Sequence, residues 1–173
     1  TERNRHKDGA PAPWSREKAL SHLASLCAAA EQCEADLREK MRRHSLQGED
    51  ADAVIDYLYE HRFLDETRFA RAYARDKSRL AGWGRIKIDM MLRSKRVAAF
   101  AIREALAAIP PDEYREAGER VARSAARSLD LTLYEDRAKL MRRMYARGFE
   151  PDLARDIISG LMAETTWERD LPQ

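Results

Sequence analysis

Residues 64–97 read LDETRFARAYARDKSRLAGWGRIKIDMMLRSKRV. The pattern predicts one helix, a Gly-Trp-Gly break at 82–84 and a second helix, because glycine permits backbone angles that other residues avoid. The stretch is also more basic than its surroundings. From Arg68 to Arg103 there are eleven Lys or Arg against two Asp, a local charge of +9, whereas the whole chain carries +2, so the remaining residues sum to −7. Attraction to a polyanion is the usual reason for such a separation of charge.

Helical geometry places the cations of this stretch on one side of each helix. At about 100° per residue, one stripe of the first helix collects Arg68, Arg71, Arg75 and Arg79. The neighbouring stripe, which we expect to face inward, collects Phe69, Tyr73 and Leu80. The expected apolar side of the second helix is Ile88, Met91 and Leu92. An ordinary solvated face is the alternative explanation of the charge run.

Composition favours a helical, soluble protein. In 173 residues the charged fraction is 36%, and Gly and Pro together number only 13, which favours helices over a β-rich fold. No apolar run approaches 18 residues and no signal-peptide pattern is present, so we expect a cytoplasmic protein without membrane contact. The two cysteines, Cys27 and Cys33, do not form a disulfide framework in a chain of this size, and we expect reduced thiols.

The apolar pattern recurs three times along the chain. One set has spacings of four and then five residues: Leu37, Met41 and Leu46; Ile88, Leu92 and Val97; Leu140, Met144 and Phe149. A second set follows in register: Ala51, Val54, Ile55 and Leu58; Ile102, Ala105, Leu106 and Ile109; Ala154, Ile157, Ile158 and Leu161. The copies are offset by 51 and 52 residues. The predicted fold is therefore all-α, with three tandem three-helix repeats that form an elongated, curved array.

The repeats also suggest boundaries. We predict a disordered leader at 1–13, a first repeat at 14–63, a second at 64–110, a third at 111–164 and a frayed tail at 165–173. Ser15 and Asp65 are expected helix caps, and Pro110 and Pro111 mark the junction before the third repeat. The turn between the second and third helices of each repeat carries Ser45, Arg96 or Gly148, of which only Gly148 suits a left-handed cap.

The sequence offers no catalytic or metal-binding constellation. The four histidines are scattered, and Cys27 and Cys33 lack the usual zinc-finger spacing. Gly-Trp-Gly lacks the strand and the spacing of a phosphate-binding loop. We therefore expect no catalytic residue, no metal, no cofactor and no enzymatic activity. Trp83 is either an apolar plug of the corner or a stacking residue at an interface.

The middle stretch resembles the signature of the RecX regulatory proteins of bacteria. The resemblance rests on Leu64-Asp65-Glu66-x-Arg68-Phe69-Ala70, on Gly82-Trp83-Gly84 and on Ile88-x-x-x-Leu92-x-x-Lys95-x-Val97. It extends to the architecture of three tandem three-helix repeats. Its structural motif residues are Asp65, Phe69, Gly82, Gly84, Ile88 and Leu92. Arg85 stands where the family commonly has Pro, and Arg96 stands where it commonly has Gly.

The resemblance implies a non-enzymatic modulator of the RecA recombinase, most simply an inhibitor. Such a protein lies along the RecA–DNA filament and restrains strand exchange, ATP hydrolysis and the SOS response. We expect a monomer whose basic patch contacts acidic protein surface or single- or double-stranded DNA. The candidate contact residues are the cations and the tryptophan of the middle stretch: Arg68, Arg71, Arg75, Lys77, Arg79, Trp83, Arg85, Lys87, Arg93, Lys95 and Arg96.

Two other functions fit the same features. One is a direct DNA-binding regulator in which the Gly-Trp-Gly corner belongs to a helix-turn-helix. The residues from 85 to 96, however, offer only Ser94 besides charges for reading bases. The other is a helical adaptor for a different protein, with an incidental basic patch.

Overall fold

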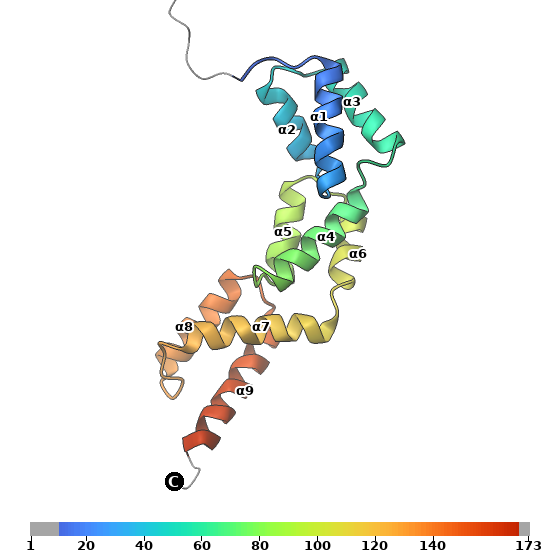
Figure 1. Ribbon diagram of the computed structural model, residues 1–173. Helices are drawn as coiled ribbons and strands as arrows, with labels where there is room; N and C mark the ends of the chain where they lie inside the picture. Colours follow the sequence, from blue (N-terminus) through green and yellow to red (C-terminus); the bar gives the residue numbers. More distant parts are fainter. Residues whose placement is uncertain (1–10, 170–173) are drawn as a thin grey trace, which may run out of the picture. The chain divides into compact units, whose positions relative to one another are not determined.

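The computed structural model describes residues 11–169, except for the side chains of 165–169 (Figure 1). These residues form helices and no strand, which confirms the all-α class. The helices are α1 (Arg16–Ala29), α2 (Glu34–Arg43), α3 (Glu49–Glu60), α4 (Glu66–Arg79), α5 (Arg85–Ser94), α6 (Ala99–Ala107), α7 (Pro111–Ala126), α8 (Tyr134–Ala146) and α9 (Pro151–Arg169).

The chain divides into two compact units. Within the described residues, the first unit comprises 11–69 together with the short segment Lys95–Val97, and the second comprises 70–94 and 98–169. In the first unit α3 packs against α1 and α2, and in the second α7, α8 and α9 pack against one another (Figure 1). The second predicted repeat therefore contributes residues to both units.

The repeating apolar positions form the cores, as the sequence predicts. Of the 21 positions, 20 are buried, and Leu106 is half-buried. Leu37, Ile88 and Leu140, which are equivalent in the three repeats, are all at most 1% exposed. Because every repeat buries the same positions, residues 51 or 52 apart in the sequence occupy equivalent places in successive three-helix repeats.

The inward face of α4 differs from the prediction at one end. Phe69 is buried and Tyr73 is half-buried, but Leu80 is 80% exposed. The helix ends at Arg79, so the angular rule that placed Leu80 on the inner stripe no longer applies there. The face is completed instead by small residues spaced four apart, which are buried: Ala70, Ala74 and Ser78.

The helix ends follow local chemistry. Ser15 Oγ accepts a hydrogen bond from the Lys18 N–H (3.2 Å), and Asp65 Oδ1 accepts one from the Arg68 N–H (2.8 Å), so both predicted caps are confirmed. Proline begins α7 and α9, where its missing N–H costs little. At the carboxyl end, α9 continues through Arg169, so residues 165–169 are helical where the sequence predicted a frayed tail. Residues 1–10 of the predicted leader and 170–173 of the tail lie outside the described residues.

The turn after the middle helix of each repeat has the same left-handed residue. Ser45, Arg96 and Gly148 have φ of 60°, 63° and 85°. The left-handed cap predicted at Gly148 is thus confirmed, and Ser45 and Arg96 adopt the same conformation although the sequence suggested that only glycine suits it. Such a conformation costs roughly 1–2 kcal/mol for a residue with a Cβ.

The carbonyl immediately before each left-handed residue accepts a bond from another segment. His44 O accepts from the Trp14 N–H (3.0 Å), and Arg147 O accepts from the Gly84 N–H (2.8 Å). Lys95 O accepts from the Cys33 thiol at 3.5 Å. A helix-terminal carbonyl has no donor within its own helix, so each of these bonds supplies what the helix cannot.

In the first repeat, the donor comes from the segment that precedes α1. The Trp14 ring stacks on the His44 ring, with centroids 3.9 Å apart and planes within 7°. His44 Nδ1 also lies 2.8 Å from Ala12 O. Residues 12–14 therefore cover the turn between α2 and α3.

We predict that Arg96→Gly raises the free energy of unfolding by about 0.5–1 kcal/mol, because glycine adopts φ near 63° without the Cβ penalty. Urea denaturation measures the change. Arg103→Gly, which removes the same charge from the interior of α6, should lower stability by about 1 kcal/mol. If Arg96→Gly is also destabilising, the Arg96 side chain contributes more than its backbone strain costs.

Candidate functional site

The Gly-Trp-Gly corner lies against the third repeat through the start of α5. Three consecutive N–H groups, those of Gly84, Arg85 and Ile86, donate to Arg147 O (2.8 Å), Tyr114 Oη (2.9 Å) and Gly148 O (3.1 Å). The first N–H groups of a helix have no acceptor within the helix. The third repeat therefore provides the cap of α5, and the two repeats are joined by backbone groups.

Two glycines make this approach possible. A Cβ on Gly84 would lie 2.1 Å from Gly148 O, and a Cβ on Gly148 would lie 2.4 Å from the Lys87 backbone N. Gly82 instead has a φ of 62°. The sequence predicted that glycine supplies unusual backbone angles at this break. In the structure only Gly82 of the two has a left-handed φ, and both glycines lie against the third repeat, since a Cβ on Gly82 would lie 2.6 Å from Val121 Cγ2.

Arg85 is used inside the second unit. Its guanidinium carbon lies 4.1 Å from the centre of the Tyr114 ring, and its Nη2 donates to Ile109 O at 3.4 Å. Tyr114 Oη donates to Glu150, whose other oxygen is 3.8 Å from Arg85 Nη1. Burial, followed by this hydrogen bond, raises the pKa of Tyr114 above its ordinary value. This half-buried network fixes the orientation of Arg85 toward the third repeat and away from solvent.

Most other cations of the predicted surface have carboxylate partners. In the first unit Arg68 pairs with Glu31 (2.7 Å) and Lys95 with Asp36 (2.6 Å). The hydrogen bond that Arg68 donates to Glu31 raises the pKa of Arg68. Three more pairs lie in the second unit: Arg71–Glu104 (3.2 Å), Arg75–Asp76 (3.1 Å) and Arg93–Asp89 (2.7 Å). Exposed pairs of this kind add little stability, but they reduce the positive field that a polyanion would meet.

Trp83 is half-buried between two lysines. Lys77 Nζ lies 5.0 Å and Lys87 Nζ lies 4.6 Å from the centre of its ring. Lys77 Nζ is also 5.4 Å from the centre of the Tyr73 ring. Cation–π attraction holds both ammonium groups at the corner, so Trp83 orders two cations.

Lys87 and Arg79 also line a groove of about 660 Å³ in the second unit. We call it the cationic groove and define it by its five cations: Arg79, Lys87, Arg120, Arg143 and Arg147. Among the residues that the structure describes, no acidic one lines it. The last three cations belong to the third repeat and were not among the predicted site residues. The signal that could have indicated two of them is the four-residue spacing of Arg143, in the last turn of α8, and Arg147, the residue that follows the helix, which places both on one side.

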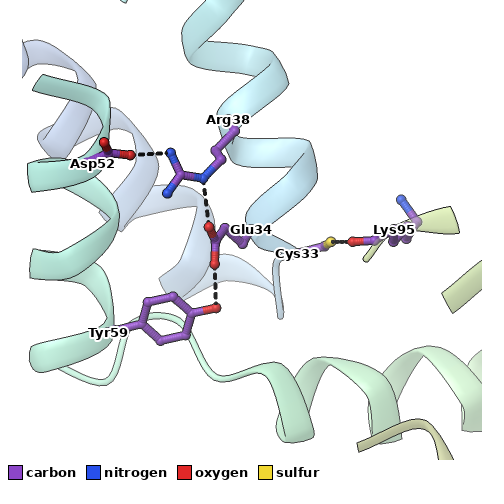
Figure 2. Close-up of polar contacts among 6 residues, drawn as sticks. All are labelled: Cys33, Glu34, Arg38, Asp52, Tyr59 and Lys95. Atoms are coloured by element: carbon purple, nitrogen blue, oxygen red, sulfur yellow. Dashed lines mark hydrogen bonds and ion pairs between the residues drawn. The ribbon is translucent and has the colours of Figure 1, made fainter. Parts of the chain in front are cut away.

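Arg96 lies in the first unit, beside a small cavity of about 150 Å³. The cavity is also lined by Cys33 and Tyr59. Figure 2 shows Tyr59 donating to Glu34 (2.9 Å), while Arg38 bridges Glu34 and Asp52 at 2.7 Å each. Burial raises the pKa of the Cys33 thiol, which keeps it protonated and able to donate to Lys95 O.

The remaining residues of the sequence motif contribute to core packing or to helix capping. Phe69, Ile88 and Leu92 are buried, and Asp65 caps α4. Among the residues that the structure describes, no cluster of three or more His, Cys, Asp or Glu side chains is placed to hold a metal ion. None of the described helices has the length and apolarity needed to cross a membrane.

Three-helix repeats joined by turn-to-helix contacts define an all-α helical-repeat protein. The chain belongs to the RecX family: residues 65–106 match "RecX, second three-helix domain", and residues 112–158 match "RecX, third three-helix domain". The resemblance inferred from the middle stretch is therefore confirmed.

Curated relatives carry the name "Regulatory protein RecX". One from Lactobacillus gasseri is 27% identical over 130 residues, which is 75% of this chain and 48% of the relative. One from Clostridium botulinum is 29% identical and covers 72% of this chain and 59% of its own length. The chain thus spans about half the length of the first relatives. The crystal structure of RecX from Lactobacillus salivarius has the same fold, with a TM-score of 0.73 and 17% identity over 86% of this chain and 97% of that one.

We predict that Gly148→Ala lowers the free energy of unfolding by about 3 kcal/mol, because the new Cβ would meet the Lys87 backbone at an already left-handed residue. Gly160→Ala is the matched control. A Cβ at Gly160 in α9 meets nothing within 4 Å, so this change should raise stability by up to about 1 kcal/mol. Equal effects of the two substitutions on thermal unfolding would contradict the close approach.

Proposed function

We propose that this protein is a non-enzymatic modulator of RecA, most simply an inhibitor. It binds along the RecA–DNA filament as a monomer in the cytoplasm, needs no cofactor, and restrains recombination, ATP hydrolysis and the SOS response. Membership of the RecX family carries this proposal. The curated relatives are regulatory proteins by name, and a binding protein built from repeats fits that role.

The corner between α4 and α5 supports the proposal physically. Lys77 and Lys87 are held at Trp83 by cation–π contacts and make no ion pair among the described residues. Arg79 stands at the end of α4 beside the exposed Leu80. An exposed apolar side chain among unneutralised cations can contact a nucleoprotein surface that presents both negative charge and apolar groups. We place the filament contact at this corner rather than along the whole basic stretch.

The helix-turn-helix alternative is less well supported by this arrangement. A recognition helix reads base edges with its N-terminal residues. Here the N–H groups at the start of α5 donate to the third repeat, and Arg85 is held against Tyr114. The start of α5 therefore has an internal role that competes with entry into a major groove.

The proposal predicts that Lys77→Ala/Lys87→Ala weakens inhibition of RecA-catalysed ATP hydrolysis on single-stranded DNA about tenfold, and that the salt dependence of the effect becomes shallower. The measurement is a titration of ATP hydrolysis with each protein at two salt concentrations. Wild-type protein should inhibit more strongly at the lower concentration.

Arg75→Ala/Arg93→Ala is the matched control for this experiment. It also removes two cations from α4 and α5, but both already have aspartate partners, so inhibition should change less than threefold. If wild-type protein leaves ATP hydrolysis unchanged but retards one DNA sequence selectively in a gel-shift assay without RecA, the helix-turn-helix alternative is correct.

A further inference from the structure

We propose that the cationic groove is a binding site for the phosphodiester backbone of a nucleic acid, formed jointly by the second and third repeats. The inference deepens the proposed function, on which it rests for its biological setting, by naming a direct ligand besides RecA. In this proposal the phosphates are bound chiefly by three arginines of the third repeat, and not by the arginines at the N-terminal end of α4.

The arginines of the groove are positioned by backbone carbonyls. Arg120 Nη2 donates to Arg79 O (3.2 Å), and Arg147 Nη1 donates to Ala81 O (2.8 Å). Arg143 Nη1 donates to Ala125 O (2.6 Å). A guanidinium has five N–H donors, and one contact fixes the group while leaving others for a ligand. Because a neutral carbonyl rather than a carboxylate accepts from each group, these contacts neutralise none of the three charges.

Little of the charge of the groove is neutralised within the described residues, although Asp136 interacts electrostatically with Arg143. None of its five cations makes an ion pair there, and no lining residue is acidic. By contrast, Arg68, Arg71 and Arg93 each have a carboxylate within 3.2 Å. Like charges that converge on one concavity repel one another, so an anionic ligand that bridges them would relieve that repulsion.

A nucleic acid strand fits this groove better than an acidic protein surface does. A strand carries a phosphate at every nucleotide, so it can meet several of the cations in succession, and guanidinium groups bind phosphate oxygens in pairs. Leu80 lines the same groove and is 80% exposed, which gives a base or a sugar an apolar contact. Lys87 belongs both to the groove and to the Trp83 corner, so the strand can continue toward an aromatic ring.

The test is binding of a fluorescent oligothymidylate to the protein alone, without RecA, followed by anisotropy at several salt concentrations. A duplex of the same length forms a second arm. Arg120→Ala/Arg143→Ala should weaken binding about tenfold and reduce the salt slope by about 1.4 on the single strand, or about 1.8 on the duplex. The arm with the tighter wild-type binding identifies the source of the phosphates.

Arg115→Ala/Arg155→Ala is the matched control, because it removes the same charge from the third repeat at arginines that already pair with Glu119 and Asp152. It should leave binding within about twofold of wild type. Arg120→Lys/Arg143→Lys keeps the charge and should preserve the slope if folding is intact by circular dichroism. Equal losses in the two alanine variants would overturn the site, since net charge alone would then explain binding.

RecA experiments separate this inference from the proposed function. If wild-type protein inhibits RecA but does not bind either oligonucleotide, the phosphate site is wrong and the proposed function stands. If inhibition is then lost in Arg120→Ala/Arg143→Ala, the groove binds an acidic protein surface instead. Binding of oligonucleotide without any effect on RecA would support the site and contradict the proposed function.

Discussion

The structure depends on one helix-terminal carbonyl that recurs in every repeat and is satisfied from outside its helix. A left-handed residue ends the middle helix, and the carbonyl before it has no donor within the helix. His44, Lys95 and Arg147 carry this carbonyl, and each accepts a hydrogen bond from a different segment. Leaving such a group without a partner costs about 1–3 kcal/mol when water is excluded. Satisfying it links the repeat to another part of the chain.

The donors differ, and the difference sets how closely the segments meet. Gly84 uses its backbone N–H at 2.8 Å, because neither Gly84 nor Gly148 carries a Cβ. In the first unit, the equivalent donor is the thiol of Cys33, at 3.5 Å, and the left-handed residue is Arg96. A thiol is a weak donor, and a cavity of about 150 Å³ lies beside this contact. Cys33 and Arg96 thus stand where the later contact has Gly84 and Gly148. With these side chains present, the contact is made by a thiol instead of a backbone N–H.

The core was predictable because apolar periodicity is local information. Register alone identified the buried positions of all three repeats, and proline and aspartate indicated helix starts. Leu80 was placed wrongly because the pattern does not show that α4 ends at Arg79. The role of Gly84 was not predictable either, since the carbonyl that it approaches is 64 residues away in the sequence.

The candidate site, too, could be predicted from the sequence only in part. Counting charges located the basic stretch, but a count does not distinguish a cation with a carboxylate partner from one without. Glu31 and Glu104 neutralise Arg68 and Arg71 across 37 and 33 residues, and Arg143 approaches Arg79 only through the fold of the third repeat. The segment at 12–14 has a separate consequence. The Trp14 ring stacks on His44 and its backbone N–H donates to His44 O, so the first repeat closes this turn with the segment before α1, whereas the third repeat meets Gly84 of the second repeat at the equivalent carbonyl.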